Sequence, residues 1–336
     1  MASLPRITVL GSLNIDLVAY VSHHPLPGET MTANSVAVSP GGKGANQAVA
    51  CAKLSRSSTD HSDATANVSM IGTVGSDSYG TLLRNNLAEH GVDVSGVSIL
   101  PAPQKSGMAL IVVDEPTGQN RIILSPEANH ALQPEDFKSF RPEENELVRK
   151  SGGLPDLLIM QLEIPIPTVL QALRAAKEAG VPVLLNPAPA VKLPEEVYEG
   201  LAHLVVNETE ASILGEVEES VLDTEEGLER VAAGFVAKGV RSVIITLGGR
   251  GVYFYRKSPV DGVVKKGLLP ALKAKVVDTT GAGDTFVGQY ALEVVEKGEN
   301  GVDIEAAMRK ASKASAKTVE RAGASVSIPW RDELVF

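Results

Sequence analysis

The sequence predicts an α/β fold in which helices flank a central, mostly parallel sheet. From about residue 150 onward, short apolar runs alternate with helical patterns, which is typical of βαβ units on a parallel sheet. Polar or glycine-rich residues follow several of these runs, and open α/β sheets bind their ligands at such strand ends. The 336 residues are enough for one large α/β domain or two smaller ones.

Composition and charge exclude several classes of function. The chain is 43% hydrophobic and 21% charged, as in ordinary globular proteins, and its net charge of −10 argues against nucleic-acid or anionic-membrane partners. Its single cysteine, Cys51, excludes an intrachain disulfide and a Cys-rich zinc site. The chain starts without a secretory pattern, and no apolar run approaches the roughly 20 residues that span a bilayer. We therefore expect a cytosolic protein that is also small enough to enter a nucleus.

The first predicted strand covers residues 7–10 and ends at Gly11. Asn14 and Asp16 follow it, at a position where open sheets place ligand-binding groups. The alternative is a turn, since turns also favour Asn and Asp.

Four further strands are predicted away from the main sheet. They cover residues 17–22, 34–39, 107–114 and 121–124, and the last two form a hairpin. Two separate pieces of chain, about 15–40 and 105–125, would thus build one small sheet, which suggests a lid. The outer face of this sheet would also suit a dimer interface.

A glycine-rich segment, P-G-G-K-G-A-N-Q over residues 40–47, opens a helix that continues through 48–54. Its glycines allow close approach of the backbone to a ligand, and Lys43 and Asn46 can reach back over the helix start. Because Gly44 follows the lysine, this is not a Walker A loop, and a neutral polyol is as plausible a ligand as phosphate. The polar stretch 55–67 is interpreted as an exposed loop insertion without chemistry in its two acidic residues and one histidine.

Strands and helices alternate through the rest of the chain. Strands are predicted at 68–74, 157–161, 183–185, 204–206, 243–246 and 252–255, with helices at 79–90 and about 168–180. Glu163, the N-P-A-P of 186–189, the N-E-T-E of 207–210 and the glycine-rich turn 247–251 follow strands, and Asn207 is expected to cap a helix. A single acid there would usually be a solvated helix-start residue, but several strand ends at one edge indicate a site.

The strongest evidence on function comes from residues 276–288, V-V-D-T-T-G-A-G-D-T-F-V-G. Gly281, Ala282 and Gly283 open an apolar helix, whose first N–H groups and dipole favour an anion such as phosphate. A carboxylate at Asp284 would repel such an anion. Both features are explained if the amides hold a phosphoryl group during its transfer while Asp284 takes the proton of the attacking hydroxyl. The alternatives are that Asp284 is an ordinary N-cap and that Asp278 is a plain strand-end residue.

Several common motifs are absent: G-x-G-x-x-G after the first strand, H-E-x-x-H, G-x-S-x-G and Walker A. The motifs that are present resemble those of the ribokinases, in the PfkB-type family of sugar and nucleoside kinases: Asn14 with Asp16, G-G-K-G-A-N-Q, Q-L-E, N-P-A-P, N-E-T-E, T-L-G-G-R-G, D-T-T-G-A-G-D-T-F and the tail A-G-A-S-V-S-I-P-W. The likeness covers nearly the whole chain apart from 55–67 and 142–151.

This resemblance implies a single three-layer domain over residues 1–336, with a β lid that pairs two subunits. It implies ATP-dependent phosphorylation of the 5-hydroxyl of D-ribose, with Asp284 as the general base and the amides of Gly281, Ala282 and Gly283 as the anion hole. The residues implied to hold the sugar are Asn14, Asp16, Gly41, Gly42, Lys43, Asn46, Glu163 and Asp284.

The resemblance also implies binding sites for ATP and for metal ions. The ATP site would comprise Asn207, Thr246, Leu247, Gly248, Gly249, Arg250, Gly251, Gly283, Asp284 and Ser312, the last at a position where ribokinases often carry histidine. Glu210 would position Mg²⁺ through water. A monovalent cation, usually K⁺, would be held by Asp278, Thr280, Thr318, Arg321, Gly323 and Ser327, mostly through backbone carbonyls.

Two other functions stay open on the sequence. One is a related kinase that acts on a nucleoside or on another pentose or ketose. The other is a ligand sensor that kept the fold and lost catalysis, although the intact Asp284 and G-A-G run argue against it.

Overall fold

The computed structural model describes residues 3–258 and 260–334; the remaining positions of the expected domain 1–336 lie outside the described residues. The strands are β1 (Arg6–Leu10), β2 (Asn14–Val21), β3 (Ser35–Gly41), β4 (Asn67–Gly75), β5 (Asp93–Leu100), β6 (Gly107–Asp114), β7 (Asn120–Ser125), β8 (Leu157–Met160), β9 (Val183–Leu185), β10 (His203–Asn207), β11 (Ser242–Thr246), β12 (Val252–Lys257) and β13 (Val264–Leu269). The α-helices are α1 (Lys43–Leu54), α2 (Ser78–Glu89), α3 (Glu146–Lys150), α4 (Ile166–Glu178), α5 (Glu208–Gly215), α6 (Glu225–Ala237), α7 (Ala282–Lys297) and α8 (Ile304–Thr318).

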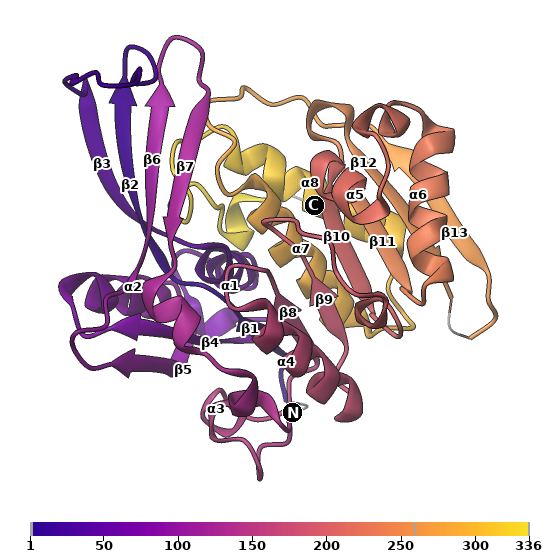
Figure 1. Ribbon diagram of the computed structural model, residues 1–336. Helices are drawn as coiled ribbons and strands as arrows, with labels where there is room; N and C mark the ends of the chain where they lie inside the picture. Colours follow the sequence, from indigo (N-terminus) through magenta and orange to yellow (C-terminus); the bar gives the residue numbers. More distant parts are fainter. Residues whose placement is uncertain (1–2, 259, 335–336) are drawn as a thin grey trace.

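The strands form two sheets, a central one of nine strands in the order β13-β12-β11-β10-β9-β8-β1-β4-β5 and a small one in the order β3-β2-β6-β7 (Figure 1). All neighbours from β5 across to β11 are parallel, whereas β12 and β13 are antiparallel additions at one edge. The predicted α/β class with a mostly parallel sheet is confirmed. The edge strands β5 and β13 were not predicted, since each carries polar residues and a glycine that weaken the strand pattern.

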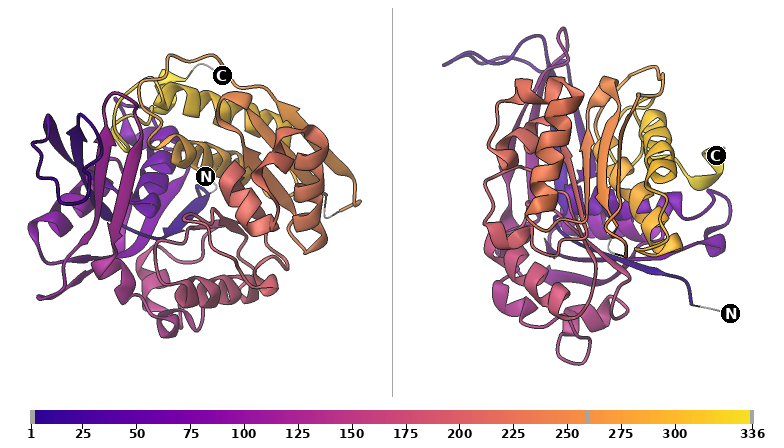
Figure 2. Two further views of the ribbon diagram at one scale, coloured as in Figure 1. Left: turned by 45° about the horizontal axis from the view of Figure 1, so that its top comes forward. Right: turned by 90° about the vertical axis from the view of Figure 1, so that its right-hand side faces the viewer.

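Helices cover both faces of the central sheet, which makes three layers (Figure 2). The helices α1, α7 and α8 share one apolar core with the sheet, and α4, α5 and α6 share another on its opposite face. In α1 every residue after Lys43 is buried, because the helix is packed between the sheet and α7. At this contact a Cβ added to Gly288 would lie 2.5 Å from the Cβ of Ala50, so the two helices approach too closely for any larger residue. No helix in the described part of the chain is both long and apolar enough to span a bilayer.

The small sheet joins the two pieces of chain that were expected to build it. β2 pairs with β3 in the antiparallel sense and with β6 in the parallel sense, and β7 completes the sheet beside β6. Asn14 and Asp16 lie within β2 rather than in a connection after β1, because the chain bends into the small sheet at once. Two of the candidate sugar-binding residues therefore lie at the start of a strand of the small sheet.

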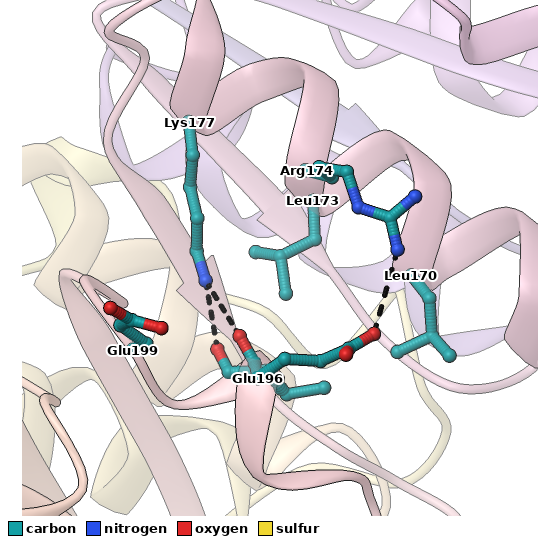
Figure 3. Close-up of a pocket in the computed structure, with 7 residues that line it drawn as sticks. Leu170, Leu173, Arg174, Lys177, Glu196 and Glu199 are labelled. Atoms are coloured by element: carbon teal, nitrogen blue, oxygen red, sulfur yellow. Dashed lines mark hydrogen bonds and ion pairs between the residues drawn. The ribbon is translucent and has the colours of Figure 1, made fainter.

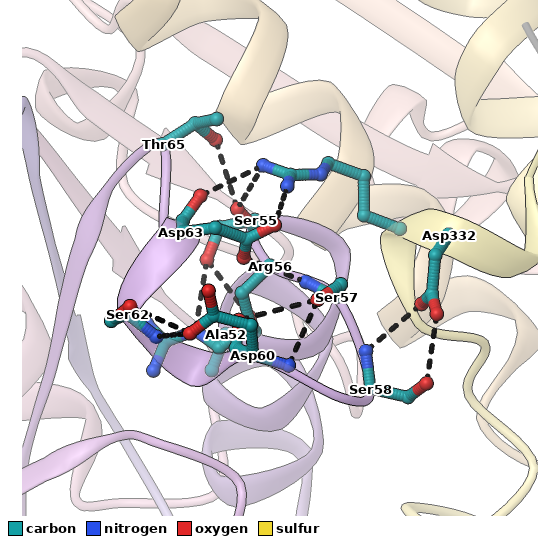
Figure 4. Close-up of polar contacts among 11 residues, drawn as sticks. Ala52, Ser55, Arg56, Ser57, Ser58, Asp60, Ser62, Asp63, Thr65 and Asp332 are labelled. Atoms are coloured by element: carbon teal, nitrogen blue, oxygen red, sulfur yellow. Dashed lines mark hydrogen bonds and ion pairs between the residues drawn. The ribbon is translucent and has the colours of Figure 1, made fainter.

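The segment 55–67 differs from the free loop that was expected. Its middle is exposed, but its polar side chains hold the C-terminal segment (Figure 4). The carboxylate of Asp63 pairs with Arg331, the hydroxyl of Ser58 donates to Asp332 at 2.8 Å, and the ring of His61 stacks on Trp330 at 4.9 Å. The composition predicted a loop correctly. Its contacts could not be predicted, because the partners are more than 250 positions away in the sequence and no local pattern indicates them.

Candidate active site

The helices α1 and α7 meet at their N-terminal ends around Asp284. The N-cap of α7 is Gly281, with φ 77°, so Asp284 lies within the first turn and the interpretation of Asp284 as a helix cap is wrong. Gly281 takes this left-handed conformation without the cost that a side chain would bring. The N–H of Ala282 already donates to the carbonyl of Thr279 at 3.3 Å, so Gly281 and Gly283 are the better amide donors of the three predicted ones.

Asp284 is 8% exposed and is held by two amide side chains of α1. Its Oδ2 accepts a hydrogen bond from Nδ2 of Asn46 at 3.2 Å, and its Oδ1 accepts one from Nε2 of Gln47 at 3.0 Å. Burial raises the pKa of Asp284, while Lys43 and the two amides oppose that rise. A carboxylate of raised pKa at the start of a helix has the properties of a general base.

Glu163 binds two groups of the predicted sugar site, from Asn14 and Lys43, and one hydroxyl outside it. Its Oε2 accepts hydrogen bonds from the hydroxyl of Ser12 at 2.6 Å, from the backbone N–H of Lys43 at 3.0 Å and from Nδ2 of Asn14 at 3.3 Å. The end of β1, the start of β2, the start of α1 and the loop after β8 thus converge on one carboxylate.

Charge is concentrated around the ammonium group of Lys43. Burial would lower the pKa of Lys43, but Asp284, Glu163, Glu210 and Asp16 outweigh burial and raise it. Burial, Glu163 and Asp284 raise the pKa of Asp16 to about 7, against the opposing effect of Lys43. The predicted sugar and phosphate residues therefore share one electrostatically coupled pocket.

Glycines leave the space that this pocket needs. A Cβ on Gly41 would lie 2.1 Å from Oδ2 of Asp16, and one on Gly42, where φ is 89°, would lie 2.7 Å from the backbone nitrogen of Asn14. A side chain at either position would displace the residues that were predicted to hold the sugar.

Sequence reasoning missed several residues that support this pocket. Asn129 is 1% exposed, and its Nδ2 donates to Oδ1 of Asn14 at 2.7 Å. Ser12 bonds to Glu163, as described above. The G-G-K-G-A-N-Q motif included Gln47, but no role was assigned to it. Only the motif drew attention to Gln47; Ser12 and Asn129 stand in stretches without a local signal.

Most of the residues predicted to bind ATP lie at the ends of β10 and β11. Asn207 caps α5 as predicted: its Oδ1 accepts from the N–H of Glu210 at 2.8 Å, and the Glu210 carboxylate accepts from the N–H of Asn207 at 2.9 Å. Burial raises the pKa of Glu210. The hydroxyl of Thr246 donates to the carbonyl of Val206 at 3.3 Å, which ties the two strand ends together.

The glycine-rich turn follows β11 directly. Leu247 is buried, and its N–H donates to the carbonyl of Gly251 at 2.8 Å; Gly248 and Gly249 lie in the 3-10 turn between them. The guanidinium of Arg250 pairs with Glu208 and donates a 3.0 Å bond to the carbonyl of Leu222. Ser312 lies in α8 and is partly buried.

The predicted cation residues come together from two segments. Asp278 lies in irregular chain after β13, so its interpretation as a strand-end residue is wrong. Its Oδ1 accepts from the hydroxyl of Thr280 at 2.7 Å, and its Oδ2 accepts from the N–H of Gly323 at 2.8 Å. Thr318 is buried and lies 2.9 Å, hydroxyl to hydroxyl, from Thr285, which in turn donates to the carbonyl of Gly281 at 2.8 Å.

The side chains of the other two predicted cation residues, Arg321 and Ser327, are bonded to residues outside this group. Arg321 pairs with Glu333 at 2.9 Å, and the hydroxyl of Ser327 donates to the carbonyl of Ala324 at 2.7 Å. Carboxylate, hydroxyl and carbonyl oxygens suit a hard cation. Within 3–258 and 260–334, no cluster of three or more His, Cys, Asp or Glu side chains could hold a metal by itself. A Mg²⁺ ion held by one carboxylate, water and substrate phosphates agrees with that finding.

A surface pocket of about 250 Å³ lies elsewhere, between α4 and the 3-10 turn Glu195–Val197 (Figure 3). Arg174 pairs with Glu196 at 3.5 Å, and the ammonium group of Lys177 donates to the carbonyls of Glu196 and Val197 at 3.2 and 3.1 Å. Arg174 and Lys177 are thus both bound to the 3-10 turn that forms one wall of the pocket. It shares no residue with the cluster around Asp284, and we assign it no catalytic role.

Comparison with known proteins agrees with this geometry. Residues 4–331 match the family model described as pfkB family carbohydrate kinase. A ribokinase of Schizosaccharomyces pombe is 40% identical over 327 residues, covering 96% of this chain and 95% of that protein, and a deoxyribokinase of Salmonella typhi is 35% identical, covering 96% and 95%. The structure of an Arabidopsis thaliana ribokinase complexed with ribose and ATP is 31% identical, with a TM-score of 0.81 and coverage of 98% and 97%.

Proposed function

We propose, from the premise that this chain belongs to the pfkB family of carbohydrate kinases, that it transfers the γ-phosphoryl group of ATP to the 5-hydroxyl of D-ribose. The observation that carries the proposal is the convergence of α1 and the start of α7 on a buried Asp284, whose charge also acts on Asp16 of β2. The proposed sugar-binding residues lie near the ends of β1 and β8, close to Asp284. The proposed nucleotide-binding turn follows β11, two strands beyond β9 in the same sheet.

Asp284 is proposed as the general base. Its raised pKa makes it a competent acceptor for the proton of the attacking hydroxyl, and Asn46 and Gln47 limit its rotation. The amides at the start of α7 face the position where negative charge develops on the transferred phosphoryl group. Such a site acts through positioning and electrostatics, as phosphoryl transfer requires.

The pocket around Glu163 is proposed to hold the sugar. Carboxylates and amides bind neutral hydroxyls through directional hydrogen bonds, and Asn14, Asp16 and Glu163 offer several acceptors in a small volume. Lys43 offsets part of their charge. An acidic wall also disfavours a second phosphate on this side of the pocket, so a neutral sugar suits it better than a sugar phosphate.

Two metal ions are part of the proposal. Mg²⁺ would be held by the ATP phosphates and, through water, by Glu210, and it neutralises phosphate charge. K⁺ would be held by Asp278, Thr280 and carbonyls of the segment 318–327. The Thr318–Thr285–Gly281 contacts link that segment to the anion hole, so the cation would stabilise the loop whose amides face the phosphoryl group.

Dimerisation through the lid is also proposed. One row of residues across the small sheet, Val38, Leu17, Leu110 and Ile123, is apolar, and it faces away from Asp16. Ile123 is 67% exposed in a single chain, which is costly unless another surface covers it. Sedimentation velocity should give a dimer for the wild type and a monomer for Ile123→Asp; a monomeric wild type at micromolar concentration would refute this pairing.

The experiment that tests the activity is coupled ADP release with D-ribose, 2-deoxy-D-ribose, adenosine, fructose and no sugar, each in K⁺ and in Na⁺. We expect turnover that depends on ribose and is faster in K⁺. Preference for 2-deoxyribose or adenosine would keep the chemistry of Asp284 and replace the acceptor. Folded protein without turnover on any of them would favour a sensor.

A further inference from the structure

Gln47 is a buried amide that belongs to none of the proposed sugar, nucleotide and metal sites, although it contacts the proposed base. It lies in the second turn of α1, is 0% exposed, and directs its Nε2 at two acceptors. These are Oδ1 of Asp284 and Oδ1 of Asn186, each at 3.0 Å. Both hydrogens of the amide nitrogen are therefore engaged, one of them by the proposed base.

The orientation of this amide is fixed from outside. Nε2 of Gln161 donates to Oε1 of Gln47 at 2.6 Å, and Nδ2 of Asn186 donates to the carbonyl of Val205 at 2.9 Å. The second bond turns the oxygen of Asn186 toward Gln47. If the Gln47 amide were flipped, its oxygen would face two oxygens and its nitrogen would face a nitrogen, so only one orientation satisfies all its neighbours.

The sheet leaves space for this arrangement. Gln161 directly follows β8, and Gly11 directly follows the neighbouring strand β1. A Cβ on Gly11 would lie 2.0 Å from Oε1 of Gln161. The glycine thus admits a side chain that reaches from the sheet to α1, and Gln161 is itself 0% exposed.

We propose that Gln47 is a positioning residue for the reaction: held by Gln161 and Asn186, it keeps the Asp284 carboxylate ionised and fixes its plane for proton transfer. This rests on the proposed function, in which Asp284 is the base. A donor that cannot turn away stabilises the carboxylate more than the carboxylic acid, and so opposes the effect of burial. Asn46 donates to the other oxygen of Asp284, but it also belongs to the predicted sugar site.

Gln47→Met retains most of the side-chain volume and removes the donor. A hydrogen bond to a charged group is worth roughly ten- to a hundredfold in an equilibrium constant, so we expect the acid limb of the kcat–pH profile to move up by about one to two pH units. On the acid side of the profile kcat should fall by the same roughly ten- to a hundredfold, while the KM for ribose should change by less than about threefold, since Gln47 makes its hydrogen bonds to Asp284 and Asn186 and not to Glu163.

Two further variants test whether a shift of the acid limb comes from the position of Gln47. Gln161→Met leaves Gln47 in place and removes its support, so it should move the acid limb in the same direction by less. Gln289→Met is the matched control: Gln289 is a buried glutamine of α7 whose Nε2 bonds to Glu293 at 3.0 Å, away from Asp284, and its acid limb should match the wild type. Thermal melts and ATP binding verify that each variant is folded.

The outcomes separate this proposal from the one on which it rests. If Asp284→Asn keeps near-normal turnover, Asp284 is not the base and both proposals fall. If Asp284→Asn is inactive but folded Gln47→Met and Gln161→Met show the wild-type acid limb, only the positioning role is overturned. Upward shifts in both variants, with none in Gln289→Met, support it.

Discussion

The backbone N–H of Gly323 donates a 2.8 Å hydrogen bond to Oδ2 of Asp278, which joins the segment before α7 to the loop after α8. The other carboxylate oxygen holds Thr280, two residues farther along. One side chain thus connects the two segments from which the proposed K⁺ ligands come.

Asp278→Asn should remove the response to monovalent cations. The neutral amide can still accept one backbone bond, but it loses the charge that favours K⁺. We expect wild-type turnover to rise about tenfold from a large organic cation to K⁺ at constant ionic strength, within the usual range of coupling between sites, and the variant to show a flat response. Asp93→Asn is the control, because Asp93 is an exposed aspartate that also accepts a hydrogen bond from a nearby backbone N–H; its response to cations should match the wild type. Equal wild-type rates in all cations would argue against a functional ion.

Asp284→Asn should fold, bind both substrates and lose roughly 10²–10⁴ in turnover, the usual scale for a general base. The amide preserves the shape of the side chain but cannot take the proton. Calorimetric titration with ribose and with ATP measures binding, and single-turnover ADP formation measures chemistry. Near-normal activity in the purified variant would refute the assignment of the base.

Asp16→Asn should stabilise the unliganded protein while weakening sugar binding. The pKa of Asp16 is about 7, above its ordinary value of 3.8, so the folded state holds a proton that the unfolded state releases. The wild type therefore loses stability as pH rises from about 4 to 7, and the variant does not. Because the side chain is partly exposed, we expect a gain of about 1–3 kcal/mol at pH 8 and little near pH 4.

Urea unfolding of the wild type and Asp16→Asn at pH 4.5 and pH 8, without ligands, measures this gap. The KM for ribose should rise in the variant at pH 8, because a carboxylate acceptor has been replaced by an amide. A gap that does not change with pH would show that Asp16 titrates normally in the folded protein.

Gly288→Ala should destabilise the fold by about 1–3 kcal/mol, the usual cost of overpacking. The new methyl would lie 2.5 Å from the Cβ of Ala50 and 2.9 Å from backbone atoms of α1, and neither partner can move aside freely. Gly234→Ala in α6 is the matched control, since nothing lies within 4 Å of its added Cβ. It should gain about 0.4–1 kcal/mol. Equal melting temperatures for the two variants would contradict the tight contact.

Glu299→Gln should weaken the fold at neutral pH. Glu299 follows α7, and its carboxylate lies 2.5 Å from Nε2 of the buried His203 and 3.2 Å from the guanidinium of Arg241. Burial would raise the pKa of Glu299, but His203, Arg241 and Arg256 lower it to about 2. Its stabilisation is thus complete above about pH 4.5 and is lost as pH falls toward 2.

We expect Glu299→Gln to cost about 2–3 kcal/mol at pH 7 and less at pH 3, measured by urea unfolding. Glu296→Gln provides the comparison, because Glu296 is 55% exposed and pairs only with its neighbour Lys297 among the described residues. It should change stability by no more than about 0.5 kcal/mol. The same loss from both variants would point to a general charge effect instead.

Much of the fold could be predicted because its signals are local. The period of the apolar residues indicated most strands, the polar N-E-T-E run marked the strand end at Asn207, and a glycine-rich turn marked the one at 247–251. The strand β13 escaped prediction because its Lys265, Lys266 and Gly267 interrupt the β pattern, and antiparallel pairing with β12 overrides that weakness.

In the candidate site, too, residues in local motifs could be predicted and residues that depend on distant partners could not. The motifs drew attention to Asp284, Lys43 and Glu163, whose residue types carry the chemistry. The supporting residue Asn129 and the role of Gln161, which stands in the Q-L-E motif, could not be predicted, because each acts through a partner more than 100 positions away. Amides of this kind look like ordinary polar residues until the fold supplies the partner.

The contact between Gly288 and Ala50 has a consequence for how acceptor preference can diverge among relatives. Because α1 and α7 are packed backbone against backbone, the base and the amides that hold it shift together or not at all. The start of β2, by contrast, belongs to a separate sheet and meets only the beginning of α1, through Glu163, so exchanges at Asn14 and Asp16 leave the Gly288–Ala50 contact itself in place. Differences in sugar preference among relatives should therefore occur mainly in the strands of the small sheet, while Asp284, Asn46 and Gln47 should stay unchanged together.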